Sequence, residues 1–167
     1  MLFRSKVISW FQGDMEFGPR ALGHRSILAS PARSEMKDRV NAIKRRESFR
    51  PFAPIVPAER AAEFFELEGE SPFMLFALRV RENARERLGA ISHVDGSARV
   101  QTLRREANPL LYALLEAVGE RSGAPVLLNT SFNLNDEPVV CSPADAVRTF
   151  CRSALDALVI GPFLVSR

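Results

Sequence analysis

The chain has 167 residues, 46% of them apolar, and a net charge of +3, which fit one globular domain and exclude a surface charged enough to clamp a polyanion. The sequence has no apolar run as long as a membrane span and no signal-peptide core, and its two cysteines make neither a disulfide framework nor a zinc site. We therefore expect a single domain over residues 1–167, in the cytoplasm and with no membrane partner.

Two short strands are predicted near the start of the chain, over Val7–Phe11 and Ser26–Ala29, with a glycine-rich loop between them. The loop contains Arg20 and Arg25. Its glycines let a ligand approach the backbone closely, and its arginines offer paired hydrogen-bond donors. Such a loop suits an anion, although an ordinary turn with surface arginines has the same residue types.

A helix is predicted after Ser34, a favoured N-cap residue. Its apolar side chains recur at helical spacing in Met36, Val40 and Ile43. Three basic residues, 44–46, follow at the end where cations complement the helix dipole. The dipole alone explains this basic cluster without any ligand.

The next segment is dominated by proline. Residues 47–57 contain three prolines, which exclude a helix and place Arg50 on stiff, extended backbone. A helix from Pro57 to about Leu67 and a strand from Phe73 to Val80 are predicted next. Residues 81–89 are rich in charge, as in a solvated loop or a short helix.

An Asp-Gly pair at positions 95 and 96 predicts a hairpin. Its strands would be residues 92–94 and 97–102. Arg99 would then project from the second strand of this hairpin.

The C-terminal third alternates helical and extended patterns. Helices are predicted from Asn108–Pro109 to Gly119 or Gly123 and from Ser142 onward, and strands over Val126–Leu128, Val139–Val140 and Leu155–Ile160. On the second helix, Val147, Phe150 and Cys151 are predicted to face inward, and both cysteines have the apolar neighbours of buried thiols. Together these elements predict an α/β (α+β-like) fold with a mixed sheet and flanking helices.

An uncharged polar run, Asn129–Asn133, follows directly on the strand Val126–Leu128. Ligands of α/β proteins bind at the carboxyl ends of strands, so this run is a candidate binding segment. Ser131 lacks the glycines of a nucleophile elbow and a histidine base, which favours a hydrogen-bonding role. His24 and His93 have no metal-ligand spacing, and we predict no protein-held metal.

The remaining candidates are basic, hydroxyl and amide side chains on loops and segment ends: Arg20, Arg25, Lys44, Arg50, Arg99, Asn129, Ser131 and Asn133. Such donors position phosphates and neutralise their charge, as is needed for a nucleotide with its Mg²⁺. The sequence has neither a GxxxxGK[ST] loop nor a GxGxxG that opens a helix. Both familiar nucleotide folds are therefore disfavoured.

Four motifs carry a resemblance: EFGPRALGHRSILA, KRRESFRPFAP, HVDGSARVQT and PVLLNTSFNLNDEPVVCSP. In this order and spacing they resemble the C-terminal domain of the ATP-dependent O-carbamoyltransferases, the NodU and antibiotic-tailoring family. The resemblance implies a YrdC-like fold, a twisted sheet of parallel and antiparallel strands with flanking helices. It also implies an N-terminal actin-like domain, in cis or in trans, that holds an iron and the acceptor, and for which this chain has no room.

The resemblance implies that the domain uses ATP and carbamoyl phosphate to form carbamoyl adenylate, with release of pyrophosphate. The ligand-binding positions carried over are Arg20, Lys44, Arg50, Arg99 and Ser131. Arg20 and Arg50 would contact phosphate or carbamoyl oxygens, Lys44 and Arg99 the developing charge, and Ser131 the α-phosphate region. Lys44, Arg50 and Arg99 are thus the expected catalytic residues, with Asn129 and Asn133 as further binding residues.

Two positions depart from the family pattern: His24 stands where Asn is usual, and Asp136 where Gly is usual. Two alternatives remain. One is a non-catalytic nucleotide-binding or interaction module. The other is an RNA-associated role in threonylcarbamoylation, which the low net charge disfavours, so nucleic acid is not an expected partner.

Overall fold

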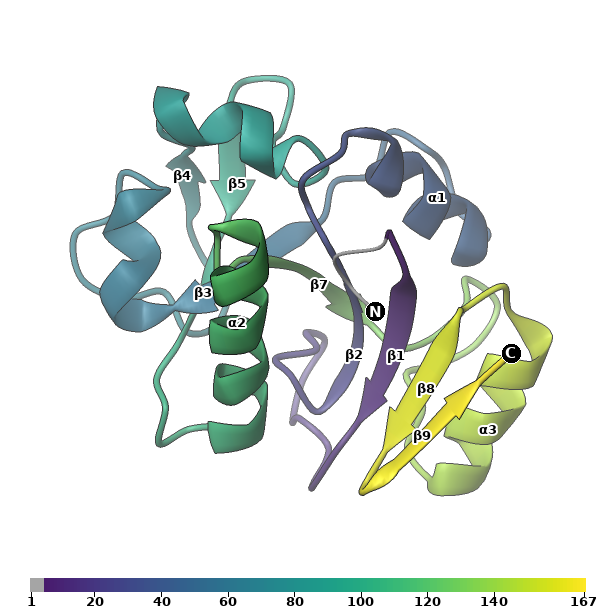
Figure 1. The fold of residues 1–167 in the computed structure, drawn as a ribbon. Coiled ribbons are helices and arrows are strands. Elements are labelled where there is room, and N and C mark those ends of the chain that lie inside the picture. Colours follow the sequence, from purple (N-terminus) through teal and green to yellow (C-terminus); the bar gives the residue numbers. More distant parts are fainter. Residues whose placement is uncertain (1–4) are drawn as a thin grey trace.

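The computed structural model describes residues 5–167, which form a central sheet covered by helices (Figure 1). Within these residues the sheet has seven strands in the order β6-β3-β7-β2-β1-β8-β9. Their bounds are Val7–Phe11 (β1), Arg25–Ala29 (β2), Ala53–Pro57 (β3), Gln101–Leu103 (β6), Leu127–Ser131 (β7), Ala157–Ile160 (β8) and Phe163–Ser166 (β9). The β1–β8 and β3–β6 pairs are parallel and the other four are antiparallel, which confirms the predicted mixed α/β sheet.

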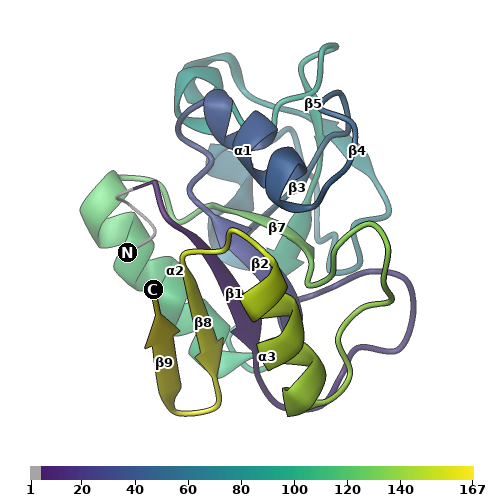
Figure 2. The same cartoon turned by 90° about the vertical axis from the view of Figure 1, so that its right-hand side faces the viewer.

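Within the described part of the chain, three α-helices pack on this sheet: α1 (Glu35–Ile43), α2 (Pro109–Ser122) and α3 (Pro143–Arg152). Helix α2 buries its apolar side chains against one face of the sheet, in a cluster that includes Ile8, Leu28 and Leu127. Helices α1 and α3 belong to a second cluster on the opposite face (Figures 1 and 2). Alternate residues of each strand point to opposite faces, so β1 and β2, which are covered on both sides, are buried along their whole length.

The helix caps predicted for α2 and α3 are present. The Asn108 side chain accepts a hydrogen bond from the Leu111 amide, and Gly123 ends α2 in the left-handed conformation, with φ of 77°. Ser142 and Asp145 form a capping box at the start of α3. These contacts satisfy backbone groups that the first and last turns leave unpaired.

Several predicted elements are shorter than expected. The helix after Pro57 is a 3₁₀-helix, η2 (Ala58–Glu63), and residues 81–89 contain another, η3 (Glu82–Leu88). The strand predicted over 73–80 is confined to β4 (Ala77–Arg79). Met74 has a φ of 56°, which interrupts extended backbone.

The Asp-Gly turn at 95–96 forms, but the predicted hairpin partner is wrong. Strand β5 (Ser97–Arg99) pairs antiparallel with β4 rather than with residues 92–94. The carboxylate of Asp95 accepts hydrogen bonds from the Ser97 amide and hydroxyl, which closes the turn locally and leaves β5 free to pair elsewhere.

Other predictions fail at the C-terminal end. Residues 139–140 form no strand, and β9 is an additional strand that pairs with β8. Both cysteines and Val147 are exposed, whereas Phe150 is buried as expected. Apolar neighbours in sequence did not indicate burial here, because Cys141 precedes α3 and only one side of α3, without Val147 and Cys151, meets the sheet. No helix within residues 5–167 combines the length and apolar character needed to cross a bilayer.

Candidate functional site

A small cavity lies where the loop before β2, the segment after α1, and strands β5 and β7 meet. Its volume is about 90 Å³. The polar side chains in its lining are those of Arg20, Arg46, Arg99, Asn129, Thr130 and Ser131. We call it the arginine cavity. No carboxylate belongs to its lining in the described part of the chain, so its charge is uniformly positive.

The loop that carries Arg20 is shaped by Glu16. The Glu16 Oε1 atom accepts hydrogen bonds from the backbone amides of Leu22 (2.6 Å), His24 (2.7 Å) and Arg25 (3.3 Å). One carboxylate oxygen thus accepts from three amides at the end of the loop and the start of β2. These hydrogen bonds fix the C-terminal end of the loop next to β2, while the side chain of Arg20 remains exposed at the cavity.

Arg25, the first residue of β2 at the end of this loop, is a structural residue. It is buried, with its guanidinium 3.6 Å from the centre of the Phe11 ring. Its Nη1 donates to the carbonyls of Gln12 and Gly13, each at 3.0 Å. Burial lowers its pKa from the usual value, with Glu16 acting in the opposite direction. Arg25 therefore anchors the loop and is not part of the cavity lining.

Arg46 reaches the cavity because the chain reverses just before it. Arg45 has a φ of 54°, which turns the backbone after α1 back toward the sheet. The Arg46 Nε donates to Asn41 Oδ1 at 2.7 Å, and its guanidinium lies 4.5 Å from the centre of the Phe52 ring. Burial and then the nearby charge of Arg50 lower the pKa of Arg46 to about 10.

Arg99 completes the positive cluster. Burial and then the charge of Arg20 lower the pKa of Arg99. The charge of Arg99 in turn contributes to the lowered pKa of Arg46. Arg20, Arg46 and Arg99 form no ion pair with a carboxylate among the described residues, and Arg99 Nε is buried without a hydrogen-bond partner. Three like charges at one cavity favour the binding of an anion that neutralises them.

A buried lysine lies behind the cavity. The Lys44 Nζ donates to the Ser131 carbonyl (2.5 Å) and hydroxyl (3.3 Å), and to the Asn133 carbonyl (2.9 Å) and Oδ1 (3.0 Å). The Ser131 hydroxyl in turn donates to Asn133 Oδ1 at 2.7 Å. Burial, and next the charge of Arg46, lowers the pKa of Lys44 to about 7. Lys44 thus holds the end of β7 in place.

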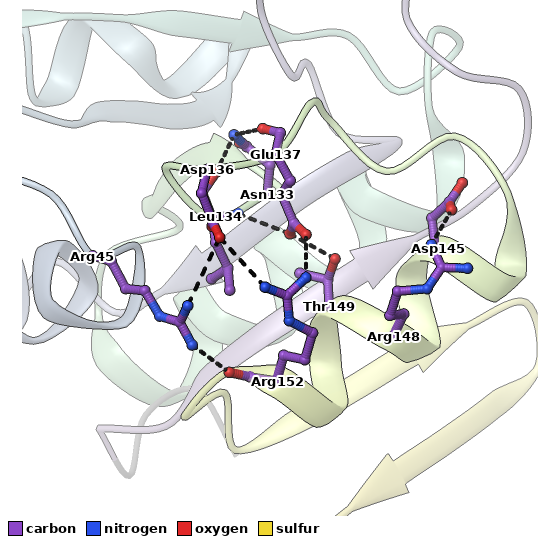
Figure 3. A network of polar contacts seen from close by, with 9 residues as sticks. All are labelled: Arg45, Asn133, Leu134, Asp136, Glu137, Asp145, Arg148, Thr149 and Arg152. Atoms are coloured by element: carbon purple, nitrogen blue, oxygen red, sulfur yellow. Dashed lines mark hydrogen bonds and ion pairs between the residues drawn. The ribbon is translucent and has the colours of Figure 1, made fainter.

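The segment after β7 is tied to α3 by the polar network in Figure 3. The Asn133 Nδ2 donates to the carbonyls of Leu134 (2.8 Å) and Glu137 (3.0 Å), and the Glu137 carboxylate accepts from Thr149 Oγ1 at 2.6 Å. Asp136 pairs with Arg152 at 3.3 Å in the same network. Asp136 stands where the related family usually has glycine, and its carboxylate is held by this ion pair.

The structure brings together most of the residues predicted from the sequence. Arg20, Arg99, Asn129 and Ser131 line the arginine cavity, and Lys44 and Asn133 support Ser131 from behind. Arg50 is exposed and paired with Glu47 at 3.0 Å, outside the lining. Sequence reasoning missed Arg46 as a site residue. Its position in the same KRRES motif as Lys44 was the available signal, but the helix dipole had accounted for it.

Two larger cavities lie beside this site. One, of about 590 Å³, adjoins the same loop and is lined by Met15, Phe17 and Phe73 among others. The other, of about 380 Å³, includes Phe49 and His93. Neither lining contains the cluster of arginines, so the arginine cavity is the candidate site for an anion.

Comparison with known proteins identifies the family. The model of the carbamoyltransferase C-terminus matches residues 1–167. The chain belongs to the carbamoyltransferase C-terminal family.

Curated relatives of this carbamoyltransferase domain are much longer. Nodulation protein NolO of Bradyrhizobium diazoefficiens is 56% identical over 165 residues, which are 96% of this chain and 30% of the relative. The 3'-hydroxymethylcephem-O-carbamoyltransferase of Amycolatopsis lactamdurans is 44% identical over 157 residues, 93% of this chain and 30% of the relative. The chain thus spans about a third of the length of these relatives.

The carbamoyltransferase domain also has a solved structural neighbour. The crystal structure of full-length HypF in the phosphate- and nucleotide-bound form superposes with a TM-score of 0.66 over 95% of this chain and 19% of that chain, at 16% sequence identity. This similarity supports the predicted YrdC-like fold class.

Proposed function

We propose that this domain binds carbamoyl phosphate and ATP and forms carbamoyl adenylate, which a further domain of the carbamoyltransferase uses for transfer to a hydroxyl acceptor. The observation that supports this most directly is the convergence of Arg20, Arg46 and Arg99 on one small cavity without a carboxylate partner in the described residues. Phosphate groups are the natural counter-ions for arginine forks of this kind.

In the proposed reaction the protein mainly positions the reactants and neutralises their negative charge. Loss of the phosphoryl group of carbamoyl phosphate to water gives carbamate and inorganic phosphate. A carbamate oxygen then attacks the α-phosphorus of ATP, a new O–P bond forms, and the bond to the bridging oxygen breaks as pyrophosphate leaves. Arginines that are fixed before the reaction stabilise the negative charge that develops in such steps.

The residues have distinct roles in this proposal. Arg20, Arg46 and Arg99 hold phosphate oxygens, and Ser131 at the end of β7 hydrogen-bonds the α-phosphate region. Lys44 fixes Ser131 and adds positive charge behind the cavity. Arg50 stands next to the cavity wall at Pro51 and would have to release Glu47 to reach a ligand.

The cavity volume of about 90 Å³ suits the carbamoyl group and one reacting phosphate, with the rest of the nucleotide outside. Its lining offers no carboxylate to hold Mg²⁺, and no metal-ligand cluster of His, Cys, Asp or Glu is found within residues 5–167. In the proposal Mg²⁺ therefore arrives with ATP, bound to the phosphate oxygens of the nucleotide, where it would neutralise their charge.

The test is pyrophosphate release, or exchange of labelled pyrophosphate into ATP, with the purified chain, ATP, Mg²⁺ and carbamoyl phosphate. We expect turnover that depends on carbamoyl phosphate and is lost in Arg99→Ala. ATP binding without pyrophosphate release would favour the non-catalytic binding module instead. Absence of both would overturn the proposal.

A further inference from the structure

The central sheet has an open edge at β9. Strand β9 is last in the strand order and pairs with β8 alone among the described residues, and Figure 2 shows it as the outermost strand on its side of the sheet. All four of its residues are exposed, and three are apolar: Phe163 is 68% exposed, Leu164 58% and Val165 43%. Successive side chains of a strand point to opposite faces, so neither face of β9 is covered.

The opposite edge of the sheet, at β6, is closed. The Thr102 amide donates to the Ser71 carbonyl, the Ser71 amide donates to Thr102 Oγ1, and Ser71 Oγ donates to the Val100 carbonyl, each at 2.9 Å. Free edges usually carry a lysine, a proline or a bulge that prevents pairing. Strand β9 has no charged residue and no proline, and its register with β8 is continuous. It therefore has the features of an edge that another strand covers.

Strand β9 is also held in place by the rest of the domain. Arg167, the residue after it, donates through its guanidinium to the carbonyls of Ser153 at 2.6 Å and Cys151 at 3.0 Å, at the end of α3. The same guanidinium lies 4.9 Å from the centre of the Phe150 ring. A strand that is already ordered loses little conformational entropy when it pairs.

The backbone that leads into β1 is fixed close to this edge. Asp156, the residue before β8, accepts from the Val7 amide at 2.7 Å and from Lys6 Nζ at 3.1 Å, and its own amide donates to the Val7 carbonyl at 2.9 Å. Strand β1 runs parallel to β8, and the start of β8 pairs with the end of β9, Ala157 with Ser166. Two strand spacings, about 10 Å, therefore separate the start of β1 from β9.

The relatives indicate what covers this edge. The matched region is the carbamoyltransferase C-terminus and makes up 30% of NolO, so most of the remaining chain of that relative precedes it and is joined before β1. A domain joined so close to β9 has a roughly millimolar effective concentration, and a short edge is enough to hold it. Two separate copies that pair through four residues each would bury far less than the about 800 Å² per partner of a typical specific interface.

We propose that β9 is the docking edge for the domain that precedes this one in the carbamoyltransferase, and that an apolar strand of that domain pairs with it. Such pairing supplies main-chain hydrogen bonds to the free edge and covers the side chains of Phe163, Leu164 and Val165. The inference goes beyond the proposed function, because it stands on the sheet and on the length of the relatives and not on the adenylate chemistry.

Hydrogen exchange of β9, followed by mass spectrometry, tests this proposal. The isolated chain is compared with a fusion in which it replaces the matched region of NolO. We expect the amides of β9 to exchange at least about tenfold more slowly in the fusion, and those of β4, which also has exposed residues, to be unchanged. Equal exchange of β9 in both proteins, or protection of β4 alone, would overturn the proposal. Protection of β9 in the isolated chain that rises with concentration would assign the edge to a second copy and overturn it as well.

A substitution in the fusion tests the edge itself. Leu164→Lys should return the exchange of β9 to the rate in the isolated chain, because a lysine on an edge strand opposes pairing. Val94→Lys, at a fully exposed apolar residue outside β9, is the matched control and should keep the protection. Protection retained in Leu164→Lys would contradict the proposal. If the NolO fusion does not fold, a fusion with the cephem O-carbamoyltransferase of Amycolatopsis lactamdurans takes its place, and absence of protection there would overturn the proposal.

Discussion

The Nζ of Lys44, at the end of α1, donates a 2.5 Å hydrogen bond to the backbone carbonyl of Ser131, the last residue of β7. The two residues are 87 positions apart in the sequence. The contact joins a helix on one face of the sheet to the strand end that lines the arginine cavity. A buried charge therefore supports a site that it does not itself line.

Anion binding should depend on the protonation of Lys44. Because burial lowers its pKa to about 7, the ammonium loses its proton as pH rises through neutrality. We expect the affinity for sulfate, a dianion throughout this range, to fall as pH rises from about 6 to about 8.5 at constant ionic strength. Calorimetric titration measures it. Lys44→Met should bind more weakly and with less dependence on pH; an unchanged profile would contradict the role of Lys44.

The same shift has a consequence for stability. Between about 7 and the ordinary value of 10.5, the unfolded chain keeps a proton on Lys44 that the folded chain has lost. Stability rises with pH wherever the unfolded state binds more protons, so this residue makes the free energy of unfolding increase over that window. Urea titrations at several pH values measure the slope, and Lys44→Met should remove this contribution.

Arg46 should matter more than Arg50 for anion binding. Arg46 lines the cavity and has no carboxylate partner in the described chain, whereas Arg50 is exposed and paired with Glu47. We expect Arg46→Ala to weaken phosphate or ATP binding by about tenfold or more, since hydrogen bonds to charged groups contribute about 1.5–3 kcal/mol. Arg50→Ala is the matched comparison, and a larger loss in Arg50→Ala than in Arg46→Ala would reverse our assignment.

Glu16 should control the position of Arg20 without touching a ligand. Its Oε1 accepts from three backbone amides of the loop. We expect Glu16→Ala to weaken anion binding and to lower stability by about 1–3 kcal/mol, because those amides lose a charged acceptor. Asp14→Ala removes a carboxylate from the same loop that accepts none of these bonds. Equal effects of the two substitutions would show that loop charge, and not loop shape, is responsible.

Alanine substitutions at two glycines of the same loop distinguish the cost of backbone strain from the cost of a steric clash. Gly18 and Gly23 both have positive φ, 121° and 115°, but a Cβ on Gly23 would lie 2.3 Å from Leu111 Cδ2, whereas Gly18 has open space. We expect Gly23→Ala to destabilise the fold by several kcal/mol and Gly18→Ala by about 1–2 kcal/mol. Thermal unfolding of the pair measures the difference. Similar melting temperatures would mean that the Leu111 side chain moves away at little cost.

Local sequence was sufficient for the elements that are specified within a few residues. The caps at Asn108 and Ser142 and the strands on either side of the glycine-rich loop could be predicted because their signals are short-range. The partner of β5 could not, because strand pairing depends on which distant segment has free backbone groups at that position. Met74 and the short β4 became visible only in the folded chain.

The candidate site, like the fold, was predictable from the sequence only in part. The sequence by itself determined which residue types gather on loops and strand ends, and hence that Arg20, Arg99, Asn129 and Ser131 were candidates for phosphate chemistry. Only the tertiary structure decided that Arg25 is buried against Phe11, that Lys44 supports the site from behind, and that Arg46 rather than Arg50 lines the cavity. The reason is physical: residue type sets what a side chain can bind, but desolvation and the nearness of other charges arise only when distant segments pack together.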